Sequence, residues 1–333
     1  MSVETAALRP GYDISRVIKG GWQLAGDHGP VERQAAIADM EAFVDAGITA
    51  FDCADIYTGV EDMIGAFIAD LRKRRGSEIA ERVQIHTKLV PDLERLATLS
   101  DRDVEAIVDR SLKRLGIERL HLVQFYWWDT AIGSPVHAME VLKRCQEKGK
   151  IAHLGVTNWD VVETAPFLDG GIDLVSTQVQ YSLLDRRPAK TLVPWSAQNN
   201  VSLLCYGTLA GGFLTDAWLG KPDPGYTFEN RSLVKYRLII DECGSWSAFQ
   251  ALLQLLKDIG DRHGVALSSV ATRWVLQQPR VAAAIVGARY ARLLPKTLEV
   301  FRFRLDDQDL AQIAEFLGTA PGPAGPVFGL ERD

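Results

Sequence analysis

Short runs of apolar residues alternate along the chain with segments in which apolar residues recur every three or four positions. Runs of the first kind are typical of buried strands, and segments of the second kind are typical of amphipathic helices. Each expected strand is followed by a segment that suits a helix, which predicts βαβ units and a parallel sheet. The expected strands are 17–24, 49–55, 83–89, 121–128, 153–158, 174–181, 201–208 and 283–287.

The helix with the clearest signals is expected at 101–115. Ser100 precedes it and Asp103 follows three positions later, which is a variant of the capping box. Gly116 stands where a glycine typically ends a helix. One apolar stripe runs along this segment at spacings of three and four, and it consists of Val104, Ile107, Val108, Leu112 and Leu115.

Eight strand–helix units predict an α/β fold, the closed (β/α)8 or TIM barrel, in one domain that spans residues 1–333. The rival is a doubly wound open sheet, which normally carries a glycine-rich turn after its first strand. Here the first strand ends in GGWQLAGDHG and lacks GxGxxG at a helix start. Two segments lie outside the repeating units. They are a long loop at 210–246 after the seventh strand, which is typical of a lid, and a tail at 318–333, which we expect to be flexible.

The composition narrows the class of protein. The 37 basic and 43 acidic residues leave a net charge of −6, so the chain lacks the positive surface of a general nucleic-acid binder. No apolar run approaches the roughly 18 residues of a membrane span, and the N-terminal residues do not resemble a secretory signal. The four cysteines are scattered without metal-ligand spacing. We therefore expect reduced thiols in a cytoplasmic protein that needs no metal.

Three polar residues stand near the ends of neighbouring strands. Asp52 lies in the second expected strand, Tyr57 just beyond it, and Lys88 near the end of the third. The carboxyl ends of barrel strands are where active sites lie. An ammonium beside a phenol favours the phenolate, and a carboxylate keeps the ammonium charged, so Tyr57 would protonate a developing alkoxide. Taken alone, the same residues also suit a polar strand end, an aromatic pocket wall and a surface lysine.

Further motifs follow in a fixed order along the chain. They are FDCADIY at 51–57, TKL at 87–89, GVTN at 155–158, QVQYS at 178–182, YGTLAGGFL at 206–214 and GAR at 287–289. Together they resemble the aldo-keto reductase family from about residue 17 to residue 317. The resemblance implies a (β/α)8 barrel and an oxidoreductase that interconverts a carbonyl compound and an alcohol with a nicotinamide cofactor. The implied cofactor is NADP, with NAD as the alternative, and the implied partner is a small carbonyl or alcohol substrate.

The resemblance also implies roles for single residues. Tyr57 matches the proton donor, and Lys88 and Asp52 match the pair that sets its acidity. Asn158 and Gln178 match residues that bind the nicotinamide carboxamide, and the ring would stack on Tyr206. The arginine of the GAR motif suits a 2′-phosphate through its guanidinium group, with Arg292 as a second candidate. The remaining residues expected at the cofactor, besides Asp52, are Gly21, Trp22, Thr157, Gly207, Thr208, Leu209, Gly211, Gly287 and Arg289.

One position departs from the family pattern. Tyr126 stands where the family usually has histidine, and an unperturbed phenol has a pKa of about 10 against about 6.5 for imidazole. Tyr126 would orient the carbonyl, or would tune the pocket to an unusual substrate or to the oxidative direction. Otherwise the chain would be a cofactor-binding regulatory or assembly subunit with little turnover. The intact Asp52, Tyr57 and Lys88 favour catalysis, and His28 is a candidate substitute imidazole.

The substrate side is expected to be aromatic. Apolar walls with few polar groups suit aromatic or alicyclic carbonyl compounds. The expected substrate-binding residues are Trp22, Tyr57, Tyr126 and Trp127.

Overall fold

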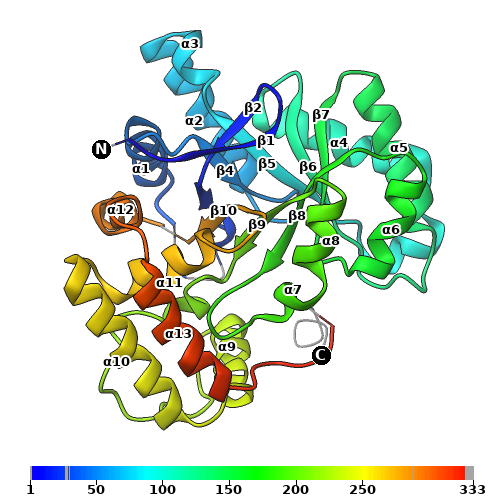
Figure 1. Cartoon of the computed structure of the whole chain (residues 1–333). Helices are drawn as coiled ribbons and strands as arrows, with labels where there is room; N and C mark the ends of the chain where they lie inside the picture. Colours follow the sequence, from blue (N-terminus) through cyan, green and yellow to red (C-terminus); the bar gives the residue numbers. More distant parts are fainter. Residues whose placement is uncertain (1, 27–28, 30, 288, 327–333) are drawn as a thin grey trace.

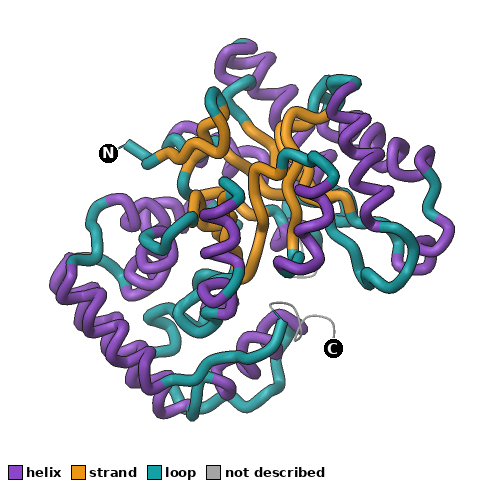
Figure 2. The backbone as a smooth tube through the Cα atoms, turned by 45° about the vertical axis from the view of Figure 1, so that its right-hand side comes forward, coloured by secondary structure: helices purple, strands orange, loops and turns teal. Residues whose placement is uncertain are grey.

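Eight parallel strands close into a barrel in the order β10-β3-β4-β5-β6-β7-β8-β9, and helices surround it (Figures 1 and 2). The computed structural model describes residues 2–26, 29, 31–287 and 289–326. The predicted (β/α)8 barrel is confirmed, with every barrel strand inside or close to its expected range. The strands are β3 (Val17–Gly20), β4 (Ala50–Asp52), β5 (Gln84–Leu89), β6 (Leu120–Phe125), β7 (Ile151–Thr157), β8 (Leu174–Gln180), β9 (Ser202–Tyr206) and β10 (Val281–Val286).

The helix expected at 101–115 begins and ends as predicted. The hydroxyl of Ser100 accepts a hydrogen bond from the backbone N–H of Asp103, whose side chain accepts one from the backbone of Ser100, and Gly116 adopts a positive φ of 64°. The α-helices are α1 (Arg33–Asp45), α2 (Val60–Arg75), α3 (Ser77–Ala80), α4 (Asp101–Leu115), α5 (Pro135–Glu147), α6 (Val161–Asp169), α7 (Arg187–Lys190), α8 (Leu192–Gln198), α9 (Arg231–Glu242), α10 (Trp246–His263), α11 (Leu267–Leu276), α12 (Leu294–Leu298) and α13 (Asp307–Thr319).

A hairpin that the sequence analysis did not predict covers one end of the barrel. Strands β1 (Thr5–Arg9) and β2 (Tyr12–Ser15) pair antiparallel before the barrel begins (Figure 1). Leu8, Tyr12 and Ile14 are buried in the same cluster as barrel-interior residues such as Leu122. The hydroxyl of Tyr12 lies 2.9 Å from Nε2 of His86. The hairpin therefore fills the floor of the barrel, and the opposite end is left for the polar residues at the strand ends.

The segment expected as a long loop after the seventh barrel strand contains the helix α9. Buried residues of α9 include Tyr236, Ile239 and Ile240. Arg237 is also buried and pairs with Asp223 at 2.6 Å. The segment forms a helix because it carries its own apolar stripe, which packs against α10 and the turn at Ala210–Gly212.

The described part of the C-terminal tail lies beside α7. Arg186 donates a hydrogen bond to the backbone oxygen of Ala320 at 2.6 Å, and Arg187 donates one to that of Pro326 at 2.6 Å. Residues 327–333 of the expected tail lie outside the described residues. Within the described ranges, none of the helices combines the length and the apolar character needed to cross a membrane.

Candidate active site

Lys88 and Asp52 form a buried ion pair at the carboxyl ends of β5 and β4. Nζ of Lys88 donates a hydrogen bond to Oδ2 of Asp52 at 2.7 Å and another to the backbone oxygen of Cys53 at 3.0 Å. Burial alone would lower the pKa of the ammonium, but the charge of Asp52, the hydrogen bond to it and the neighbouring Tyr57 together outweigh burial and raise the pKa of Lys88 above its usual value. Lys88 is therefore a permanent cation in this site.

Tyr57 lies in the turn that follows β4, next to this ion pair. Nζ of Lys88 is 5.1 Å from the centroid of the Tyr57 ring, and the ring of Trp22 meets Tyr57 edge-on at 5.0 Å between centroids. The sequence predicted a lowered pKa for this phenol, but the structure gives a raised one. Burial raises the pKa of Tyr57 by more than the charge of Lys88 lowers it. Tyr57 is thus a protonated phenol at neutral pH, which suits a proton donor.

Two buried amides complete the surroundings of Asp52. Nε2 of Gln178 lies 2.6 Å from Oδ1 of Asp52, and Nε2 of Gln124 lies 3.1 Å from the same oxygen. Gln124 was not among the predicted site residues. The available signal was a glutamine inside an apolar strand run, two positions before Tyr126 and so on the same side of the strand.

The aromatic residues that follow β6 divide between two sides of the chain. The Tyr126 ring meets the Trp128 ring edge-on at 5.0 Å, and the indole N–H of Trp128 donates to the backbone oxygen of Pro91 at 2.7 Å. Trp127 is instead buried against Phe125, and its indole N–H donates to the backbone oxygen of Ile132 at 3.0 Å. Trp127 therefore lies on the other side of the chain from Tyr126 and Trp128, and its predicted contact with a substrate stays a prediction.

Asn158 and Tyr206 meet at the ends of β7 and β9. The hydroxyl of Tyr206 donates to Oδ1 of Asn158 at 3.0 Å, and the backbone N–H of Asn158 donates to the backbone oxygen of Gln178 at 3.0 Å. Asn158 adopts a left-handed φ of 61°. Two side-chain amides beside a half-buried aromatic ring form a donor and acceptor set that fits a planar ring bearing an amide. The buried Thr157 precedes Asn158.

Glycines permit two close approaches at this end of the barrel. A Cβ at Gly21 would lie 2.6 Å from the backbone oxygen of Asp52, so Gly21 lets β3 and β4 converge beside Trp22. A Cβ at Gly211 would lie 2.6 Å from the ring of Tyr236. The predicted cofactor loop, which comprises Gly207, Thr208, Leu209 and Gly211, is therefore covered by the helix α9.

The predicted phosphate-binding residues lie after β10. Arg289 donates a hydrogen bond to the backbone oxygen of Gly29 at 3.0 Å. Its guanidinium carbon is 5.2 Å from the centroid of the Tyr290 ring, and that of Arg292 is 4.8 Å from the same centroid. The two arginines thus gather around one exposed aromatic ring, just beyond Gly287. The other sequence candidate, His28, lies outside the described residues.

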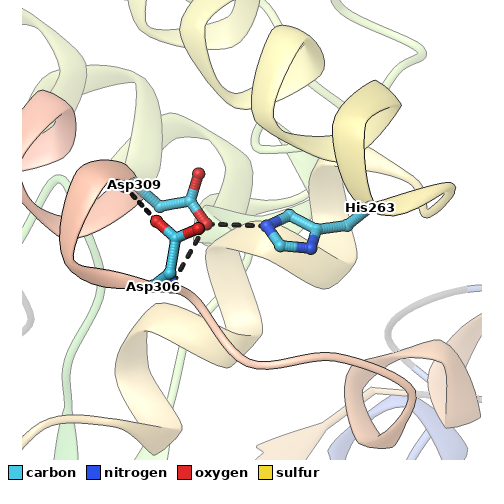
Figure 3. Close-up of side chains that lie close together, drawn as sticks. All are labelled: His263, Asp306 and Asp309. Atoms are coloured by element: carbon cyan, nitrogen blue, oxygen red, sulfur yellow. Dashed lines mark hydrogen bonds and ion pairs between the residues drawn. The ribbon is translucent and has the colours of Figure 1, made fainter.

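A second charged cluster lies away from the barrel, where α10 ends and α13 begins (Figure 3). Oδ1 of Asp306 accepts a hydrogen bond from the backbone N–H of Asp309 at 2.8 Å. Nε2 of His263 lies 2.7 Å from Oδ2 of Asp309, and Arg262 donates to Oδ1 of Asp309 at 2.7 Å. Both oxygens of Asp309 are therefore used in capping α13 and in joining it to α10.

Comparisons with known proteins show the family and the fold of this chain. The model of the aldo/keto reductase family matches residues 16–317. The chain is 29% identical over 332 residues to aldo-keto reductase YhdN of Bacillus subtilis (strain 168), covering 97% of this chain and 96% of that protein. Its fold is similar to that of glycerol dehydrogenase AKR11B4 from Gluconobacter oxydans, with a TM-score of 0.78, 24% identity and 98% of each chain covered. An aldo/keto reductase from Klebsiella pneumoniae in complex with NADP and acetate gives a TM-score of 0.71 at 21% identity, with 96% of each chain covered.

Proposed function

Since this chain belongs to the aldo/keto reductase family, we propose that it is an NAD(P)(H)-dependent oxidoreductase that interconverts an aldehyde or ketone with an alcohol. The observation that carries the proposal is the ion pair of Lys88 and Asp52 directly beside the phenol of Tyr57. Such a trio is the equipment for moving a proton to and from an oxygen atom. The bound nicotinamide would supply the hydride.

Each member of the trio has a separate task. In reduction, the hydroxyl of Tyr57 gives its proton to the carbonyl oxygen, and Lys88 stabilises the phenolate that remains. Asp52 keeps Lys88 charged and fixes its position through the 2.7 Å hydrogen bond. In oxidation, the phenolate of Tyr57 takes the proton from the alcohol. Tyr126 orients the substrate oxygen through its hydroxyl group.

The cofactor would be held by the residues at the ends of β7 to β10. Asn158 and Gln178 bind the carboxamide, Tyr206 stacks on the ring, and Arg289 and Arg292 meet the adenine end. Support for NADP comes from the complex formed by the similar Klebsiella pneumoniae protein and from the two arginines, which suit a 2′-phosphate. NAD remains the alternative cofactor.

A second candidate function follows from Tyr126. Because a phenol cannot supply the cationic assistance of an imidazole near neutral pH, a cofactor-binding regulatory or assembly subunit with little turnover is the alternative. Measured turnover separates the two functions, since a binding subunit requires the cofactor site and no proton donor.

The test is the Tyr57→Phe variant with a panel of aldehydes, ketones and alcohols, followed by cofactor absorbance in both directions. We expect turnover by the natural chain and a loss of about 10²-fold or more in kcat for the variant. The dissociation constant for NADPH and the melting temperature should change little. The matched control is Tyr226→Phe, which removes an exposed tyrosine hydroxyl that donates a hydrogen bond to Asp241. Equal activity of Tyr57→Phe would refute the proposed role, and NADPH binding without turnover by the natural chain would favour the binding subunit.

A further inference from the structure

Gln124 is fully buried in β6 and joins two residues of the site. Nε2 of Gln124 donates a hydrogen bond to Oδ1 of Asp52 at 3.1 Å, and its Oε1 accepts one from Nε2 of Gln178 at 2.8 Å. Nε2 of Gln178 also donates to Oδ1 of Asp52 at 2.6 Å. The carboxylate and the two amides therefore form a closed network, and Lys88 occupies the other oxygen of Asp52.

The hydrogen-bonding capacity of these groups fixes the direction of both amides. A carboxylate only accepts hydrogen bonds, so the amide atoms that face Asp52 must be nitrogens. The oxygen of Gln124 then faces Gln178 and takes its second N–H. A primary amide nitrogen carries two hydrogens, and both hydrogens of Gln178 are used within the network. What Gln178 offers to a ligand is therefore its carbonyl oxygen.

We propose that Gln124 is a positioning residue: it occupies the second N–H of Gln178, whose nitrogen already faces Asp52, and so leaves Gln178 only a hydrogen-bond acceptor for a ligand. The site then selects a planar primary amide presenting an N–H. The inference rests on the proposed function, in which the nicotinamide carboxamide is that amide. A nicotinamide analogue with an acetyl group in place of the carboxamide keeps the carbonyl oxygen but has no N–H. It would leave the buried oxygen of Gln178 without a donor, which weakens binding.

The test compares NADP with its 3-acetylpyridine analogue by titration calorimetry. The natural chain should bind NADP about tenfold more tightly than the analogue, since one hydrogen bond is lost and a buried acceptor is left unsatisfied. In Gln124→Met the second N–H of Gln178 is released and can donate to the acetyl oxygen. The ratio of the two dissociation constants should then fall to about one. Gln180→Met is the matched control, because Gln180 is a buried amide on β8, the strand of Gln178, and donates its hydrogen bond to Asp185 and not to the network. This variant should keep the tenfold ratio of the natural chain.

A second variant, Gln124→Glu, adds a readout that a purely structural role would not move. When protonated, the introduced carboxyl group donates to Asp52 and accepts from Gln178, as the natural amide does. When ionised, it cannot donate to Asp52 and is repelled by that carboxylate, so it moves out of the network and no longer accepts the second N–H of Gln178. In this variant the ratio of the two dissociation constants should be about tenfold near pH 5, as in the natural chain, and should fall to about one near pH 9. In the natural chain the ratio should not change with pH. Both probes carry the same phosphates, so their titration cancels.

The titratable groups that face residue 124 come from the neighbouring strands of the barrel, and they set the pKa of a carboxyl group introduced there. Asp52 on β4 raises the pKa of a carboxyl group placed here, and Lys88 on β5 opposes that effect. Tyr57 stays protonated, because burial raises its pKa. His86, one layer lower on β5, is neutral because burial lowers its pKa to about 3. On β7, Gly155 stands beside Gln124 and adds no charge.

The outcomes separate this inference from the proposed function. A natural chain that binds NADP and its analogue equally, or a folded Gln124→Met variant that keeps the tenfold ratio, overturns the inference alone. Failure of the natural chain to bind either NADP or NAD overturns the proposed function and the inference with it, and a chain that binds only NAD is tested with NAD and its 3-acetylpyridine analogue. If Gln124→Met does not fold, the pH series of Gln124→Glu decides, and a ratio that is independent of pH overturns the inference.

Discussion

Two buried lysines lie in strands on either side of β4, and they are held in opposite ways. Lys88 points into the barrel and meets the carboxylate of Asp52 at 2.7 Å. Lys19 is 2% exposed and faces the helix layer, with Nζ 5.0 Å from the ring centroid of Phe43. Burial lowers the pKa of Lys19 to about 8, and the charge of Asp39 offsets only part of this effect. The pKa of Lys88 is raised instead.

The comparison shows that burial alone does not make a lysine useful for acid–base chemistry. Burial disfavours the charged amine, and at Lys19 this effect exceeds that of the opposing charge of Asp39. At Lys88 the carboxylate of Asp52 at 2.7 Å helps to keep the amine charged, so that it can stabilise a neighbouring phenolate. The two lysines differ in the face of the strand on which they lie. Lys19 is two positions after the outward-facing Val17 and shares its face, whereas Lys88 is two positions after the inward-facing His86 and shares that face.

The largest effect is expected for Lys88→Met. Removal of the ammonium leaves the buried Asp52 without its cation, and the phenolate of Tyr57 loses its stabilising charge. We expect kcat to fall about 10²-fold to 10⁴-fold and the free energy of unfolding to fall by about 3–5 kcal/mol. Steady-state kinetics and urea denaturation measure the two losses. The double variant Lys88→Met/Asp52→Asn should recover part of the stability without activity, since the amide oxygen still accepts from Gln124 and Gln178 and no buried charge remains. Retained activity in the single variant would contradict the assignment.

The opposite result is expected for Lys19→Met, which leaves the turnover unchanged and stabilises the fold. Because the pKa of Lys19 is lower in the folded state, the unfolded chain binds the extra proton, and the cost to stability is complete below pH 8. At pH 7 the variant should gain about 3 kcal/mol in free energy of unfolding. The gain should vanish as the pH rises toward the ordinary value of about 10.4. Urea denaturation at pH 7 and pH 10 tests this, and equal differences at both pH values would refute it.

The smallest effect is expected for Asp309→Asn, in the charged cluster of α10 and α13 (Figure 3). Burial by itself would raise the pKa of Asp309. The hydrogen bonds from His263, Arg262 and the backbone of Asp306 together have the larger effect, so the pKa of Asp309 is lowered. The carboxylate therefore contributes stability above its ordinary pKa of about 3.9, and that stability is lost as the pH falls through the lowered value. We expect a loss of about 1–2 kcal/mol at pH 7, with unchanged turnover. In acid unfolding, the natural chain should lose this advantage below pH 4, and Asp307→Asn should behave as the natural chain does.

The sequence by itself determined the framework of this protein. Buried strand runs, helix stripes and the capping residues around α4 act over a few neighbouring positions, so all eight barrel strands could be predicted from them. The convergence of Asp52, Tyr57 and Lys88 was also predictable, because parallel strands in a barrel bring their carboxyl ends together. The chemical roles of these residues remain proposals.

Only the tertiary structure decided which side each residue faces and what it meets there. In the sequence, Lys19 and Lys88 are both lysines within apolar strands, and Trp127 and Trp128 are adjacent tryptophans. Nothing in the local pattern shows which of each pair faces the barrel interior. Three further features also came only from the structure: the interior position of Gln124, the hairpin that fills the barrel floor and the helix α9 over the predicted cofactor loop. The physical reason is that side-chain orientation and pKa depend on strand register and on partners far away in the chain, which local patterns do not contain.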